Sequence, residues 1–147
     1  MRLEKILVKD IMHDVTPVPM KSSITEAAKI MNRKLIGSVL VVKDGEPVGM
    51  LTERDILRKV VAKGKDPRTT SIYEVMSSPL ITTHKDTALP EALKIFRKHY
   101  IRRLLITDDD GKIVGIITHR NVVLSISTTY FAKQRARRSI LSTEAMV

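Results

Sequence analysis

The chain has 147 residues, of which 43% are hydrophobic and 29% charged, and its formal net charge is +10. This composition is typical of a folded globular protein, and the absence of cysteine excludes a disulfide scaffold, a thiolate metal site and a cysteine nucleophile. The N-terminal residues mix charged with apolar side chains, and no apolar run is long enough to span a bilayer. The sequence therefore predicts a cytoplasmic protein with no membrane partner.

The positive charge is spread evenly along the chain. Residues 1–70 hold 14 Lys and Arg against 9 Asp and Glu, and residues 71–147 hold 12 against 7, so each half carries +5. Aromatic residues, which stack on bases, make up only 3% of the sequence. This distribution favours anionic ligands in general and leaves nucleic acid as a less favoured partner.

The first half of the chain contains the patterns of alternating helices and strands. Ser23 and Glu26 form a capping box before a run of apolar residues at helical spacing. Two β-branched runs flank Asp44–Gly45, which predicts a hairpin. The predicted elements in chain order are a short strand near Pro17–Val18, a helix over 23–34, strands over 38–42 and 47–51, and a helix over 53–63.

The second half repeats the first. The segment that begins at Ile24 aligns with the segment that begins at Leu89, with one extra residue in the Asp108–Asp110 turn as the only gap. Gly64 and Pro67 suit a helix end followed by a short linker. We therefore predict a first repeat over 1–64 with its motif from about residue 8, a linker over 65–70, a second repeat over 71–125, and a basic helical extension over 126–147.

Each repeat has the order β-α-β-β-α, which gives an α/β (α+β) fold class. A three-stranded sheet with helices on one face leaves its other face apolar, so one repeat alone is hardly stable in water. The sequence thus predicts two sheets packed face to face around a pseudo-twofold axis, with ligand clefts between them. Apolar residues left on outward helices favour a homodimer.

The string Val48-Gly49-Met50-Leu51-Thr52-Glu53-Arg54-Asp55, within this duplicated pattern, resembles a tandem cystathionine-beta-synthase (CBS) domain pair, also called a Bateman module. The resemblance covers roughly residues 8 to 125. It implies a non-catalytic regulatory module that binds an adenine nucleotide (AMP, ADP or ATP) between the repeats and signals to an effector protein. No cofactor is required beyond this regulatory ligand. The alternatives are a sensor of S-adenosylmethionine or methylthioadenosine, and a basic nucleic-acid-binding protein.

The residue pattern Thr52-x-x-Asp55 carries the proposed nucleotide contacts. Its carboxylate can accept both hydroxyl protons of a ribose, while the Thr52 hydroxyl and the first helical N–H groups can face phosphate. The same pattern is also a capping box, and the two roles can coexist. The second repeat has Thr118 and Asn121 at these positions; since asparagine has one acceptor oxygen and no charge, we expect the Asp55 site to be the stronger one.

The remaining site residues follow from the resemblance. Thr16, Pro17, Val18 and Ile81 are expected to face the adenine. Gly37 and Ser38 allow a ligand to approach closely, and Arg103 can reach phosphates. Arg102 and Arg103 point to opposite faces of a strand, so at most one of them contacts the ligand. Arg54 and Arg120 lie inside the two nucleotide-binding strings and complete the predicted set.

Other polar patterns are not assigned a site. His13, His84, His99 and His119 show no metal-binding spacing, and Asp108–Gly111 is interpreted as a hairpin turn. Neither a metal site nor a catalytic pair of nucleophile and base is predicted. Residues 130–145 include Lys133, Arg135, Arg137 and Arg138, which predicts either a solvated or dimer-contacting helix or a surface for acidic protein or RNA.

Overall fold

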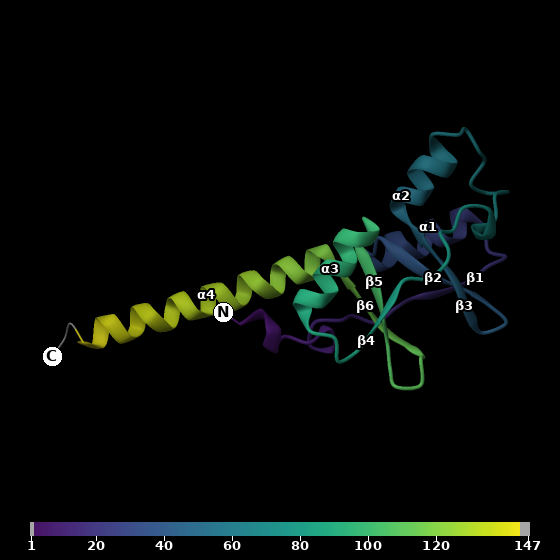
Figure 1. Ribbon diagram of the computed structural model, residues 1–147. Helices are drawn as coiled ribbons and strands as arrows, with labels where there is room; N and C mark the ends of the chain where they lie inside the picture. Colours follow the sequence, from purple (N-terminus) through teal and green to yellow (C-terminus); the bar gives the residue numbers. More distant parts are fainter. Residues whose placement is uncertain (1, 145–147) are drawn as a thin grey trace. The chain divides into compact units, whose positions relative to one another are not determined.

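The computed structural model describes residues 2–144, with the surroundings of side chains described as far as Arg138. The chain forms two compact units, each built on a three-stranded sheet (Figure 1). The first, the β1–β3 unit, spans Val15–Ile81. The second, the β4–β6 unit, combines the residues up to Asp14 with those from Thr82 onward.

The β1–β3 unit confirms the predicted order of elements. Its sheet has the order β1-β2-β3, in which β1 is parallel and β3 antiparallel to the central β2. The final helix begins as an α-helix and continues as a π-helical turn over Leu57–Val61. Its elements are β1 (Pro17–Pro19), α1 (Ile24–Lys34), β2 (Ser38–Lys43), β3 (Glu46–Thr52) and α2 (Glu53–Ile56).

The β4–β6 unit repeats this arrangement, with the sheet order β4-β5-β6. Its elements are β4 (Thr82–His84), α3 (Leu89–His99), β5 (Arg103–Thr107), β6 (Ile113–Thr118) and α4 (His119–Glu144). The predicted basic extension is a direct continuation of α4 as far as Glu144, and residues 145–147 lie outside the described part of the chain. Within residues 2–144, none of the helices combines the length and the apolar character needed to cross a membrane.

Local sequence explains where these elements begin and end. Ser23 Oγ accepts a hydrogen bond from Glu26 N at 3.1 Å, and Ser23 N donates to Glu26 Oε2 at 2.8 Å, which completes the predicted capping box of α1. Gly45 and Gly111 adopt φ of 80° and 78° in the two hairpin turns, a backbone region that glycine occupies without steric cost. Within the β1–β3 unit, Val39 and Val41 project from β2 into a core that includes Leu51.

The compact units divide the chain differently from the predicted repeat boundaries. Val8 N donates to Thr87 O at 2.9 Å, and Leu89 N donates to Ile6 O at 2.8 Å, so the N-terminal segment belongs to the β4–β6 unit. In the same way, Ile72 is fully buried in the core of the β1–β3 unit. The leading segment of each sequence repeat therefore packs with the sheet of the other repeat, a long-range pairing that local sequence patterns do not encode.

Gly49 and Gly115 are matched glycines in strands that a leading segment crosses closely. A Cβ atom at Gly49 would lie 2.7 Å from Met76 Sδ and 3.0 Å from the Ser77 carbonyl oxygen. At Gly115 it would lie 2.6 Å from Met12 Sδ. These glycines are therefore required by close packing, since a backbone oxygen cannot move aside as a flexible side chain can.

Replacing either glycine by alanine is expected to destabilise its unit. Overpacking of this kind costs about 1–3 kcal/mol, which urea denaturation of Gly49→Ala and Gly115→Ala should detect. Gly45→Asn provides the control, because no atom lies within 4 Å of its added Cβ and asparagine tolerates positive φ. Equal unfolding free energies for the wild type and both alanine variants would contradict the close packing.

Candidate functional site

The predicted ligand-binding residues of the first repeat gather at one end of the β1–β3 sheet. Leu40 N donates to Thr16 O at 2.8 Å, so Thr16 lies beside the start of β2. Ser38 pairs with Thr52, and Glu53 N donates to Gly37 O at 3.0 Å. The beginnings of β1 and β2 and the end of β3 therefore meet, as parallel and antiparallel neighbours require.

Asp55 is buried at this end of the sheet, with only 7% of its surface exposed. Its Oδ2 accepts hydrogen bonds from both the backbone N and the hydroxyl of Thr52, each at 3.0 Å, and so caps α2. Its Oδ1 accepts from Ser77 Oγ and lies 3.0 Å from Lys59 Nζ. One oxygen thus caps the helix, while the other is held by Lys59 from the next helical turn and by Ser77 from a distant segment.

Asn121 occupies the matching position at the end of β6. Its Oδ1 accepts from the Thr118 backbone N and, at 2.7 Å, from the Thr118 hydroxyl. Its Nδ2 donates to the backbone oxygen of Ile11. The amide reproduces the helix cap of the first repeat, but it presents a donor where Asp55 presents an acceptor.

The two repeats differ at one further position in this network. Lys59 Nζ donates to Val75 O at 3.0 Å, and Val75 corresponds to Ile11 in the repeat. Ser125 stands where the first repeat has Lys59, so in the second repeat the Asn121 amide bonds this carbonyl directly. The matching backbone carbonyl thus receives its hydrogen bond from Lys59 in the first repeat and from Asn121 in the second.

An open groove of about 600 Å³ lies beside Asn121 within the β4–β6 unit. The N-terminal segment forms one wall, including Lys5 and His13, and α4 forms the other, including Ser125 and Thr129. The short side chain of Ser125 leaves space at the position that corresponds to the long Lys59 of the first repeat.

The residues expected to face adenine are placed differently from one another. Pro17 is exposed and Thr16 half-buried, whereas Val18 is 1% exposed and packs in the core. Because its side chain is part of the core, Val18 could meet a ligand only through its backbone. Gly37 and Ser38 are half-buried next to Thr52, and Ile81 directly precedes β4.

The arginines of the predicted ligand-binding set lie on both units. Arg103 is half-buried and pairs with Thr118 across β5 and β6, while Arg102 is exposed. Arg54 is half-buried in α2 and Arg120 is exposed in the first turn of α4. The structure therefore brings Arg103, Thr118 and Asn121 to one end of the β4–β6 sheet.

Sequence reasoning missed the two side chains that hold Asp55 Oδ1. Lys59 looks like an ordinary solvated helix residue, and Ser77 is 22 residues away from Asp55 along the chain. Two patterns could have identified Lys59: it stands four residues after Asp55 on the same helix, and the replacement of Asp55 by Asn121 is accompanied by the replacement of Lys59 by Ser125.

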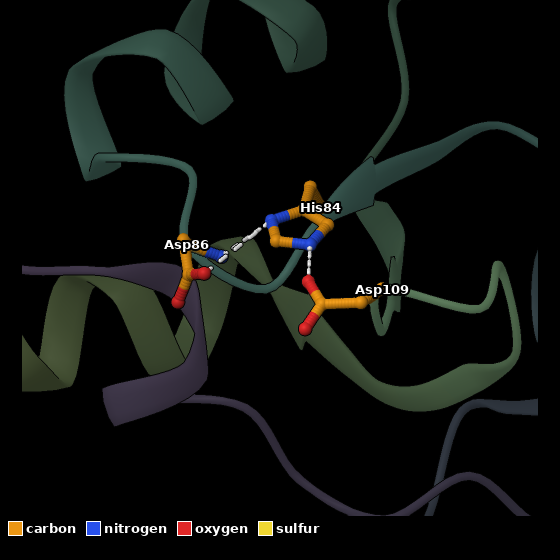
Figure 2. A group of neighbouring side chains, drawn as sticks. All are labelled: His84, Asp86 and Asp109. Atoms are coloured by element: carbon orange, nitrogen blue, oxygen red, sulfur yellow. Dashed lines mark hydrogen bonds and ion pairs between the residues drawn. The ribbon is translucent and has the colours of Figure 1, made fainter.

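Sequence reasoning also missed a cluster formed by His84, Asp86 and Asp109 (Figure 2). One ring nitrogen of His84 and one carboxylate oxygen from each aspartate lie within 4.8 Å of one another. His84 Nε2 lies 2.7 Å from Asp109 Oδ1, and Asp86 N donates to His84 Nδ1 at 3.2 Å. Lys9 Nζ lies 2.7 Å from Asp86, and Lys85 Nζ lies 3.6 Å from Asp109. These ammonium groups already neutralise the carboxylates, so we interpret the cluster as an ion-pair network.

The network changes the acidity of its carboxyl groups. The hydrogen bond from Lys9 lowers the pKa of Asp86, and the contact with His84 lowers the pKa of Asp109. The same Asp86 raises the pKa of Lys9. All of these groups are exposed, so solvent screens the interactions and they contribute little to stability.

Comparison with known proteins places this geometry in a family. Residues 8–62 and 72–128 match the CBS domain. A Methanopyrus kandleri protein is 40% identical over 74% of this chain, which spans 56% of that relative. The CBS domain-containing protein YhcV of Bacillus subtilis is 39% identical over 75% of this chain and 78% of its own length.

Solved structures agree. A protein from Pyrococcus horikoshii has a TM-score of 0.79 at 31% identity, covering 85% of this chain and 94% of the other. The CBS domain pair of the protein MJ0100, solved in complex with 5'-methylthioadenosine and S-adenosyl-L-methionine, has a TM-score of 0.73 at 30% identity. That similarity covers 84% of this chain and 98% of the other.

Proposed function

Because the chain belongs to the CBS domain family as a tandem pair, we propose that it is a non-catalytic regulatory protein that binds an adenosine-containing ligand. We further propose that the ligand is an adenine nucleotide and that Asp55 is the principal acceptor for its ribose hydroxyls. Binding biases a conformational equilibrium, and an effector protein reads the change.

The observation that carries this proposal is that the two carboxylate oxygens of Asp55 have different partners. Oδ2 is committed to the helix cap, whereas Oδ1 is held by Ser77, which is exposed, and by Lys59, whose side chain is 45% exposed. Both donors can turn to water when ribose hydroxyls replace them, so the exchange leaves no buried group without a partner. The carboxylate is thereby able to accept a diol without losing the fold of α2.

An adenosyl thioether is the second candidate ligand, and the complex of the MJ0100 domain pair supports it. The two ligand classes differ in their charge. Affinity that rises with phosphate number and falls in Arg103→Gln supports a nucleotide. Affinity that is indifferent to both supports S-adenosylmethionine or methylthioadenosine.

Exposed apolar side chains support the proposal that the protein works as a homodimer. Leu57 and Val61 in the π-helical turn are 60% and 64% exposed, and Val123 and Leu124 in α4 are 61% and 55% exposed. Within the described residues these side chains face solvent, where a second molecule would remove them from water.

A thermal-shift screen against AMP, ADP, ATP, S-adenosylmethionine and methylthioadenosine tests the proposed ligand class. A ligand present at a hundredfold its dissociation constant adds about 2.7 kcal/mol to the free energy of unfolding. The best ligand is then titrated against Asp55→Ala and Asn121→Ala. We expect the larger loss of affinity in Asp55→Ala, because only the carboxylate has a second acceptor oxygen in addition to the one that caps its helix; an equal or larger loss in Asn121→Ala would contradict this assignment.

A further inference from the structure

The part of α4 from Tyr130 to Arg138 is largely exposed to solvent. The first turn of α4 is anchored by Asn121 and Val122, which are buried. From Tyr130 to Arg138 every side chain is exposed except that of Gln134, which is half-buried. Figure 1 shows this part of α4 continuing beyond the sheet from which the helix starts. We call residues 130–138 the cationic-aromatic segment.

The segment concentrates positive charge that the chain as a whole distributes evenly. It contains four cations, and the sequence has no acidic residue between Asp110 and Glu144. Lys133 and Arg137 are four residues apart. Like charges at this helical spacing repel each other, so an anionic partner would stabilise the helix that carries them.

The same segment exposes two aromatic rings. Tyr130 is 53% and Phe131 63% exposed, and their centroids lie 5.6 Å apart at an interplanar angle of 76°. At 3.6 residues per turn, the rings and the cations are interspersed over about 200° of the helix circumference, with Lys133 and Arg135 at the two edges, and Ala132 and Ala136 fall in the remaining arc.

The mixture of cations and exposed aromatic rings in this segment favours one class of anionic partner over the others. A helix that lies on a membrane separates its cations from its apolar face, which this segment does not do. An acidic peptide supplies negative charge but no flat surfaces to stack on exposed rings. Single-stranded nucleic acid supplies both, since its phosphates pair with cations and its bases stack on aromatic side chains.

We propose that the cationic-aromatic segment binds single-stranded nucleic acid without sequence preference. Its cations contact phosphates, and Tyr130 and Phe131 stack with bases. These contacts involve neither the ribose 2'-hydroxyl nor the Asp55 site, so RNA and DNA strands of equal length should bind alike.

Fluorescence anisotropy with a labelled oligouridylate of about 20 nucleotides tests the proposal. In Lys133→Gln/Arg135→Gln/Arg137→Gln, the slope of log affinity against log salt is expected to fall by about 2, and affinity to fall about 100-fold at about 0.1 M salt. The control Lys29→Gln/Lys43→Gln/Lys98→Gln removes the same charge from exposed positions elsewhere. Equal losses in the two triple variants would overturn the proposal.

A second variant separates stacking from charge. Tyr130→Leu/Phe131→Leu keeps all cations, so we expect about a fivefold or greater loss of affinity at an unchanged salt slope. Circular dichroism verifies that each variant retains its helices. If polyglutamate or phosphatidylglycerol vesicles bind as tightly as the oligonucleotide, or if the aromatic variant binds like the wild type, the segment is not a nucleic-acid surface.

Discussion

The double variant Asp55→Asn/Lys59→Ser is expected to bind adenine nucleotide about 10- to 100-fold more weakly than the wild type. It rebuilds in the first repeat the arrangement that the second repeat already has, in which asparagine caps the helix and serine replaces lysine. The asparagine oxygen is then committed to Thr52, and the amide nitrogen cannot accept a ribose hydroxyl. A hydrogen bond to a charged group contributes about 1.5–3 kcal/mol, so its loss accounts for the expected decrease in affinity of about 10- to 100-fold. Isothermal titration calorimetry measures the dissociation constants.

The single variant Asp55→Asn is the matched control for folding. It leaves the Lys59 ammonium beside an uncharged amide, and because Lys59 is nearly half-exposed we expect a stability loss of only about 1 kcal/mol. Adding Lys59→Ser should recover part of that loss while ligand affinity stays low. If the double variant instead recovers both stability and affinity, Asp55 acts only as a helix cap.

Truncating the matched core residues Leu51 and Ile117 is expected to have the largest effect on stability. Both side chains are fully buried, and each directly precedes the threonine that caps the following helix. Replacing a buried Leu or Ile by alanine costs about 2–5 kcal/mol, because apolar burial is lost and a cavity remains. Chemical denaturation of Leu51→Ala and Ile117→Ala measures the change.

Leu57→Ala serves as the control for these truncations, since Leu57 is 60% exposed in the monomer. Its unfolding free energy should change by less than about 0.5 kcal/mol in dilute solution. Losses below about 1 kcal/mol in both core variants would mean that the strands before Thr52 and Thr118 are not packed as described.

The order of elements was predictable from the sequence because it depends on short-range patterns. The capping box of Ser23 and Glu26, the hairpin turns at Gly45 and Gly111, and the helical end at Gly64 are all confirmed. Duplication strengthened these predictions, since each element was observed twice. The membership of the compact units was not predictable in this way, because Val8 and Ile72 reach their cores through pairings between distant segments.

The candidate site was predictable only in part, for the same reason. The Thr52-x-x-Asp55 string predicts both a cap and a carboxylate at the end of a strand, and the cap is confirmed. Lys59 was missed although it stands four residues after Asp55, a spacing at which opposite charges pair on a helix, and Ser77 was missed because it comes from the leading segment of the other repeat. His84 and Asp109 were missed because a strand end and a hairpin turn bring them together.

A comparison of AMP with 2'-deoxy-AMP in the wild type and in Asp55→Asn/Lys59→Ser tests most directly whether Asp55 holds a ribose. If it does, the wild type should prefer AMP by about tenfold, the equivalent of one hydrogen bond to a charged group, and the double variant should lose that preference. An equal preference in both proteins, or none in the wild type, would contradict the role of Asp55 as a ribose acceptor.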